Sequence, residues 1–303
     1  MGFDRRMLAT ERADRGGGVM QRAETRAAIV AMGDTLGPDV LQRCTALFAP
    51  EQEALARSTP ASLVDAVYGD HPRQRLDLYR PADGSGDGVP IVLFVHGGGF
   101  RLGDKGSAVS WANANVGRMA ARAGLLGAVM NYRLAPAFGW PSGGEDVGAA
   151  VDWLRTNAAA HGGDGRRIVL VGTSAGAVHV ATHLQLRPES AGVRAAALLS
   201  GLYGVSPLDE RDNIYFGPSA RMPLEALATA TTPLLVAGAE FDPPRFQAEL
   251  LGLLRLRLER QGSLPRTYVA SGHNHYSISL HLGGADTRLA DEIIAFVHQQ
   301  CEP

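Results

Sequence analysis

The sequence predicts an α/β fold with a mostly parallel sheet of about eight strands and helices on both faces. Two observations predict this class. Apolar runs rich in Val, Ile, Leu and Ala recur along the chain, and each is followed by a longer helical stretch. That alternation is typical of parallel strands that are buried on both faces. The chain also has 303 residues, which suffices for one large domain with a substantial core.

The first part of the chain predicts helices and then two strands. Residues 21–58 have a helical pattern, which breaks at Gly37 and Pro38. Residues 64–68 and 75–79 alternate as strands do, on either side of a turn that contains Pro72. A glycine-rich stretch at 83–88 separates these two strands from the remaining ones.

The rest of the chain supplies six further strands. They are predicted to begin at Pro90, Leu125, Arg167, Ala195, Pro233 and Arg266. In open α/β sheets ligands bind beyond the carboxyl ends of the strands. The residues directly after each run are therefore the candidates for a functional site.

The domain organisation is predicted to be simple. Residues 1–20 are polar and contain three consecutive glycines, so we expect a flexible N-terminal arm. Residues 21–303 are expected to form a single domain. Within it, 21–60 and 203–227 are the expected cap elements over the site.

Composition excludes several classes of function. The formal net charge is -2 and the charges are scattered, so we expect no nucleic-acid partner. The sequence has no apolar run of membrane-spanning length and no secretory signal, which predicts a cytoplasmic protein without a membrane partner. Cys44 and Cys301 lack metal-ligand spacing and fit a reduced compartment better than a disulfide framework. We expect no metal and no cofactor, and the oligomeric state stays open, with a homodimer as one option.

One strand end carries a nucleophile motif. The strand from Arg167 runs into Gly172-Thr-Ser174-Ala-Gly176, a G-x-S-x-G sequence between a predicted strand and a predicted helix. The flanking glycines allow a sharp turn that exposes the hydroxyl above the sheet. A chain with 37 glycines can contain a G-x-S-x-G sequence by chance. The position of this motif directly after an apolar strand nevertheless favours a nucleophilic Ser174.

A serine nucleophile needs a general base and a group that orients the base. The strand from Pro233 ends in Glu240-Phe-Asp242, and the strand from Arg266 runs into His273-Asn-His275. The order serine, acid, histidine along the chain is that of the α/β-hydrolase fold.

Four motifs together resemble one branch of the α/β-hydrolases, the hormone-sensitive-lipase-like bacterial carboxylesterases, which are related to the arylformamidases. The motifs are HGGGF at 96–100, NYRLAP at 131–136, GTSAGA at 172–177 and AEFDPPRF at 239–246. The resemblance extends from about residue 60 to the end of the chain. Thr173 departs from it, because many members of that branch carry an acid there.

The resemblance implies a role for each residue of the site. It implies Asp242 rather than Glu240 as the acid, and His275 rather than His273 as the base, because an aromatic residue follows His275 directly. It implies an oxyanion hole made by the backbone N–H groups of Gly98, Gly99 and Ala175. His96 is expected to brace this loop. A phosphate-binding loop is the rival interpretation, but the motif lacks the Gly-Lys-Ser/Thr ending of such loops.

The predicted function is that of a serine hydrolase that cleaves carboxylic esters of small to medium acyl chain through an acyl-enzyme. An arylformamidase or another amidase would use the same residues, and a non-catalytic small-molecule receptor is a further alternative. We expect a small-molecule ester as the substrate.

Residues 203–227 are the candidate lid, because the segment is too long for a simple connection. A surface excursion unrelated to the site is the alternative. The candidates for the pocket lining are Phe100, Tyr215, Phe216, His273 and Tyr276. The other expectation for His273 is a loop histidine that bonds local backbone. Truncation of Tyr215 or Phe216 to Ala is expected to change chain-length preference more than stability.

Overall fold

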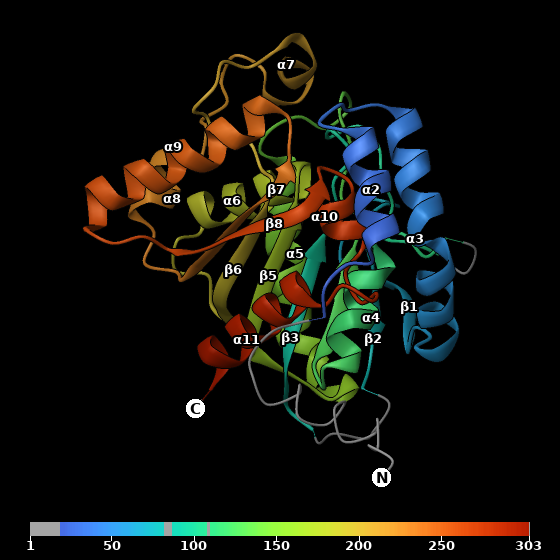
Figure 1. The fold of residues 1–303 in the computed structure, drawn as a ribbon. Coiled ribbons are helices and arrows are strands. Elements are labelled where there is room, and N and C mark those ends of the chain that lie inside the picture. Colours follow the sequence, from blue (N-terminus) through green and yellow to red (C-terminus); the bar gives the residue numbers. More distant parts are fainter. Residues whose placement is uncertain (1–18, 82–86, 108–109, 303) are drawn as a thin grey trace.

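Eight strands form one sheet in the computed structural model, which describes residues 19–81, 87–107 and 110–302 (Figure 1). The strand order is β1-β2-β4-β3-β5-β6-β7-β8. β2 pairs antiparallel with both β1 and β4, and the other neighbours are parallel. The strands are β1 (Leu63–Val67), β2 (Arg75–Tyr79), β3 (Val89–Val95), β4 (Leu126–Met130), β5 (Gly163–Thr173), β6 (Val193–Leu199), β7 (Leu234–Phe241) and β8 (Arg266–Asn274). The predicted fold class is confirmed.

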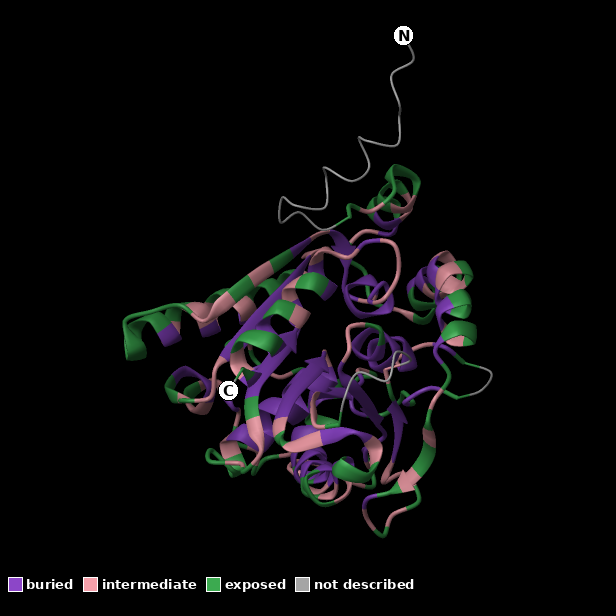
Figure 2. Ribbon diagram, turned by 90° about the horizontal axis from the view of Figure 1, so that it is seen from below, coloured by how far each residue is buried: buried purple, intermediate pink, exposed green. Residues whose placement is uncertain are grey.

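Helices cover both faces of this sheet. One face packs against α5 (Ser142–Asn157), α6 (Ala175–Leu186), α8 (Leu224–Thr229) and α9 (Pro244–Gln261). The other packs against α4 (Ala114–Arg122) and α11 (Arg288–Cys301). The central strands are continuously apolar because both faces are buried, and Figure 2 shows them as a buried layer inside more exposed helices.

The N-terminal helices lie near the carboxyl ends of β7 and β8. They are α2 (Ala23–Met32) and α3 (Pro38–Ser58), and the predicted break between them is confirmed. Figure 1 shows them side by side next to α10 (Ser277–Leu280). Phe48 of α3 belongs to a cluster that includes Leu280, and Phe241 and Tyr276 pack against that cluster. These two helices therefore adjoin the segments that carry Asp242 and His275.

The remaining short elements are α7 (Glu210–Phe216) and a 3₁₀ turn, η1 (Ala158–His161). α7 lies in the predicted lid segment, which also contains the start of α8. The predicted arm lies largely outside the described residues, as does most of the glycine-rich stretch at 83–88. Within the described ranges, no helix combines the length and the apolar character needed to span a bilayer.

One strand differs from its prediction. β8 continues to Asn274 and ends one residue before His275. The prediction that His273 lies in a loop is therefore wrong. The polar composition of residues 271–275 concealed this extension, because the pairing of Asn274 with Phe241 of β7 uses backbone groups and leaves no apolar pattern in the sequence.

Candidate active site

Ser174 occupies a strained turn between β5 and α6. Its backbone has φ 52° and ψ -121°, a region that a residue with a Cβ rarely adopts. The neighbouring glycines make this turn possible. A Cβ on Gly176 would lie 2.0 Å from the carbonyl oxygen of Val95, so only glycine lets α6 approach β3 this closely. The turn places Ser174 beyond the carboxyl end of the strand, as the motif predicts.

Three strand ends bring Ser174, His275 and Asp242 together. His275 Nε2 lies 3.0 Å from Ser174 Oγ, and His275 Nδ1 lies 2.7 Å from Asp242 Oδ1. Asp242 is 1% exposed and His275 is 6% exposed, and the His275 ring packs against Phe246 at a centroid distance of 4.2 Å. The arrangement is a continuous hydrogen-bonded chain from a hydroxyl to a buried carboxylate. Such a chain can remove a proton from the hydroxyl and stabilise the imidazolium that results.

A second serine, which was not predicted from the sequence, holds the carboxylate. Ser200 Oγ donates to Asp242 Oδ2 at 2.6 Å, and the Ala239 N–H donates to the same oxygen at 2.7 Å. Ser200 directly follows β6 and has φ 49°. Its position at a strand carboxyl end is the signal that could have identified it. With Oδ2 fixed in this way, Oδ1 faces His275.

The competing acid, Glu240, faces elsewhere. Its carboxylate accepts hydrogen bonds from Ser271 Oγ at 2.8 Å and from the Gly272 N–H at 2.6 Å, and it pairs with Arg26 of α2. These contacts lower the pKa of Glu240, with the Gly272 hydrogen bond as the main cause. Glu240 thus links α2 to β8 and makes no contact with His275.

The glycine-rich loop after β3 lies beside Ser174. A Cβ on Gly97 would lie 3.2 Å from Ser174 Cβ. Gly98 has φ 132°, and a Cβ there would lie 2.1 Å from the Leu102 carbonyl oxygen. The loop is thus a tight turn that requires glycine and exposes backbone donors. Ala175 is the first residue of α6, where backbone N–H groups have no partner within the helix.

His96 contacts the backbone of the glycine-rich loop that follows β3. It is fully buried, its Nδ1 lies 2.7 Å from the Gly97 carbonyl oxygen, and its ring stacks on Tyr132. Tyr132 OH in turn donates to the His96 carbonyl oxygen at 2.9 Å. These contacts fit the expected bracing role.

An aromatic cluster adjoins the same centre. Phe100 stacks on Tyr215 with centroids 4.3 Å apart, and Phe216 meets Phe100 edge to face at 5.3 Å. Phe246, which packs on His275, belongs to the same cluster, as does Ala175. Three of the pocket candidates therefore lie together next to Ser174 and His275.

The burial of this cluster indicates what the loss of a ring would do to stability. Tyr215 and Phe216 are each 2% exposed, and Tyr215 OH lies 3.2 Å from His179 Nδ1. Truncating such a ring to Ala costs about 3 to 5 kcal/mol of stability. We therefore expect Tyr215→Ala and Phe216→Ala to lower stability by this amount in addition to changing chain-length preference.

The other two pocket candidates lie apart from this cluster. Tyr276 OH accepts a hydrogen bond from the Gly37 N–H at 3.0 Å, so Tyr276 ties the start of α3 to the turn of His275. His273 is 1% exposed and contacts the side chains of Ser277, His281 and Asp286. It bonds side chains rather than local backbone, and it makes no contact with the aromatic cluster.

The candidate lid is fastened by a carboxylate that sequence reasoning did not identify. Glu249 of α9 is 1% exposed and accepts hydrogen bonds at 2.7 to 3.1 Å from four consecutive backbone N–H groups, those of residues 203–206. The start of the lid segment is thereby anchored to α9.

Buried histidines make stability depend on pH. Burial lowers the pKa of His96 to about 4 and that of His179 to about 3, against an ordinary value of 6.5. The unfolded chain therefore binds protons below pH 6.5 that the folded chain does not bind. We expect each of these histidines to cost on the order of 1 kcal/mol of stability for each pH unit from 6.5 down to its folded pKa.

Urea unfolding at pH 7.5 and at pH 5.5 measures this dependence. His179→Gln should flatten it, whereas a matched His298→Gln change at an exposed position should not. Equal stability of the unchanged protein at the two pH values would contradict the prediction.

Parts of this chain are similar in sequence to known proteins. The BD-FAE family model matches residues 76–198. The chain is 44% identical over 115 residues to a probable isoprenylcysteine alpha-carbonyl methylesterase, ICMEL1, of Oryza sativa, which is 38% of this chain and 25% of that protein. It is 27% identical over 272 residues to the corresponding ICME of Arabidopsis thaliana, with 77% of this chain and 61% of that protein covered. It is 40% identical over 108 residues to the carboxylesterase NlhH of Mycobacterium tuberculosis, or 35% of this chain and 32% of that protein.

Solved structures match over nearly the whole chain. The esterase LipW from Mycobacterium marinum aligns with a TM-score of 0.69 at 20% identity, covering 94% of this chain and 99% of that one. A thermostable esterase from Pseudomonas putida aligns with a TM-score of 0.66 at 20% identity, covering 95% and 99%. The chain spans less than two thirds of each of the three curated relatives, whereas it spans nearly all of these two structures.

Proposed function

We propose that this chain is a serine carboxylesterase of the hormone-sensitive-lipase-like branch of the α/β-hydrolases. The single observation that carries the proposal is the chain of hydrogen bonds from Ser174 through His275 to Asp242, at 3.0 and 2.7 Å. Its members come from the ends of three strands of one sheet. A receptor without catalysis has no need for a hydroxyl, an imidazole and a carboxylate in that alignment.

The proposed reaction has two halves. His275 Nε2 takes the proton of Ser174 as Oγ attacks the carbonyl carbon of the ester, and a tetrahedral oxyanion forms. That intermediate collapses, the C–O bond to the alcohol breaks, and His275 gives its proton to the leaving alkoxide. A water molecule then attacks the carbonyl carbon of the acyl-enzyme while His275 takes its proton. His275 returns that proton to Ser174 Oγ as the acid leaves. Asp242 keeps the Nδ1 proton of His275 in place throughout.

We assign the oxyanion hole to the backbone N–H groups of Gly98, Gly99 and Ala175. The closeness of Gly97 to Ser174 supports this, since it brings the glycine loop to the nucleophile. Donors that are already oriented toward the developing charge contribute about 3 to 4 kcal/mol each in comparable enzymes. No cofactor is needed for any of these steps.

We also propose that the aromatic cluster limits the acyl chain, with residues 203–227 as a lid and α2 and α3 as a cap. The rings of Phe100, Tyr215 and Phe216 fill the space next to Ser174. Substrates with acyl chains of about two to six carbons fit such an enclosed site better than long ones do.

A hydrolysis panel tests the substrate class. We expect aryl esters of short acyl chain to be cleaved with the highest kcat/KM, ahead of long-chain esters and of N-formyl aromatic amines. Phe216→Leu should extend the length of the accepted acyl chain, because it replaces a ring of the aromatic cluster with a smaller side chain. Phe296→Leu, a similar loss of volume in the core between α11 and the sheet, is the matched control and should leave the profile unchanged. Fastest turnover of long-chain esters would contradict the substrate class, and fastest turnover of the formamides would identify an amidase.

A further inference from the structure

The catalytic base sits in a turn that is closed by two reciprocal hydrogen bonds. The Asn274 N–H donates to Ser277 Oγ at 2.8 Å, and the Ser277 N–H donates to Asn274 Oδ1 at 3.0 Å. His275 lies between these two residues, after β8 and before α10. Because both bonds span the turn, the position of the His275 backbone depends on where Ser277 is held.

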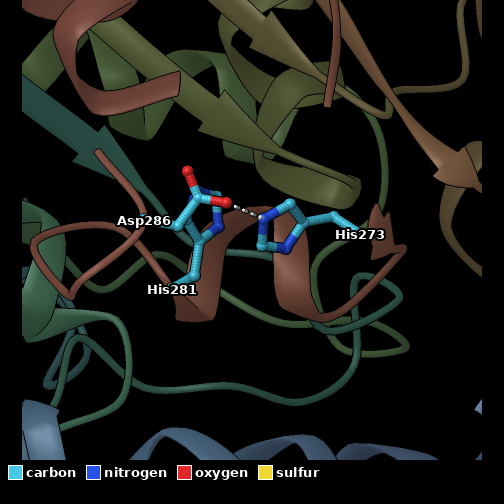
Figure 3. Close-up of side chains that lie close together, drawn as sticks. All are labelled: His273, His281 and Asp286. Carbon is cyan, nitrogen blue, oxygen red and sulfur yellow. Dashed lines mark hydrogen bonds and ion pairs between the residues drawn. The ribbon is translucent and has the colours of Figure 1, made fainter. Parts of the chain in front are cut away.

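Ser277 is held from outside the turn by a second histidine. His273 Nδ1 lies 3.1 Å from Ser277 Oγ, and His273 Nε2 lies 3.1 Å from Asp286 Oδ2 (Figure 3). Ser277 is fully buried, and His273 and Asp286 are 1% and 5% exposed. A consistent assignment of protons has His273 Nε2 donating to Asp286 and Ser277 Oγ donating to His273 Nδ1.

Asp286 is itself fixed at the start of α11. Arg288 Nη2 and Nε donate to its two carboxylate oxygens at 2.6 and 2.9 Å, and Arg288 also donates to the Ser271 carbonyl oxygen at 3.0 Å. Burial alone would raise the pKa of Asp286, but the hydrogen bonds from Arg288 and His273 hold it well below its ordinary value. Asp286 is thus a fixed anion that connects α11 to β8.

His281 holds the other end of the turn. Its Nδ1 lies 2.7 Å from the Ser277 carbonyl oxygen, and its ring stacks on His273 with centroids 3.8 Å apart. Both the hydroxyl and the carbonyl of Ser277 are therefore bonded to buried imidazoles. The two rings pack on each other, so neither can move alone.

The same groups do not converge on a metal ion. Nitrogen and oxygen atoms of His273, His281 and Asp286 lie within 4.8 Å of one another. A metal ion lies in the plane of each imidazole that binds it, and two stacked rings with planes 26° apart do not point at one ion. Arg288 already bonds both oxygens of Asp286.

We propose that Asp286, His273 and Ser277 form a positioning chain that keeps His275 Nε2 within reach of Ser174. The proposal rests on the proposed esterase function. The positioning chain contains the same three residue types as the active site, but the imidazole is reversed. In His273, Nε2 faces the carboxylate and Nδ1 faces the serine. Ser277 touches no reacting atom and acts only through the turn of His275.

Steady-state kinetics with Ser277→Ala and His273→Phe tests the positioning chain. We expect each variant to lower kcat up to about 100-fold with KM little changed, because a displaced base raises the barrier and leaves substrate binding intact. Ser279→Ala removes a hydroxyl from the same helix that makes no hydrogen bond in the described part of the chain. It is the matched control and should keep the kcat of the unchanged enzyme.

The double variant separates positioning from general loss of structure. If the two side chains act through one chain, His273→Phe combined with Ser277→Ala lowers kcat no further than the more severe single variant. Multiplying effects, or losses that appear in KM or in the unfolding midpoint without a change of kcat, would overturn the proposal. Stoichiometric zinc in the purified protein would do so as well.

Two further variants keep the test decisive. Should Ser277→Ala not fold, His273→Gln takes its place, because the amide still donates toward Asp286 but loses the ring nitrogen that faces Ser277. Ser174→Ala distinguishes failure of the positioning chain from failure of the proposed esterase function. If Ser174→Ala is inactive while Ser277→Ala has the kcat of the unchanged enzyme, this inference alone fails. If Ser174→Ala remains active, the proposed function fails.

Discussion

Replacing His275 with alanine is expected to lower kcat by several orders of magnitude while KM changes little. His275 Nε2 is the nitrogen that faces the Ser174 hydroxyl, so its loss removes the group that accepts the proton. A base acts on the barrier of the chemical step and contributes little to ground-state binding. Initial rates on a short-chain aryl ester, over a range of substrate concentrations, measure the two constants separately.

The comparison with His273 makes the test specific. Two residues earlier in the same segment, His273 bonds Ser277 and Asp286 and does not contact Ser174. Its replacement should therefore cost far less than that of His275, within the range expected for a positioning residue. Equal collapse of both folded variants, or collapse of the His273 variant alone, would show that the wrong histidine has been assigned as the base.

The sequence predicted the sheet and the turn that carries Ser174 because both have local signals. Continuous apolar runs identify parallel strands, and the elbow at Ser174 is a short motif in a defined context. The choice of Asp242 over Glu240 came from the family resemblance of the motif AEFDPPRF at 239–246, and the structure gives the two carboxylates different partners. Here the strand ends and Asp242 turns to His275, while Glu240 bonds Ser271 and Gly272.

The partners of the supporting residues could not be predicted, because these partners are distant in the chain. Ser200 contacts Asp242 only because β6 pairs with β7. Glu249 of α9 contacts residues 203–206, which lie far from it in the sequence. Both are common polar residues without a motif. His273 was assigned to a loop for the same reason, because the end of β8 is set by the pairing of Asn274 with Phe241 of β7, and the side-chain partners of His273 are Ser277 and Asp286.

The second large effect is expected at Ser174 itself. Ser174→Ala removes the proposed nucleophile and leaves the rest of the site in place, so hydrolysis should fall to a small remainder that the proposed oxyanion donors and substrate binding alone support. The variant should remain folded, since alanine keeps the Cβ and the adjoining backbone bond from the Ser174 N–H to the Leu199 carbonyl oxygen. The unfolding midpoint checks this.

Covalent labelling with an active-site phosphonate tests the central claim most directly. The account predicts that the unchanged protein takes up one phosphonate, that peptide mapping places it on Ser174, and that labelling and loss of esterase activity proceed at the same rate. His275→Ala should slow labelling strongly, and Ser174→Ala should abolish it. Labelling of another residue at the same rate as inactivation, or full esterase activity in a folded Ser174→Ala variant, would contradict the account.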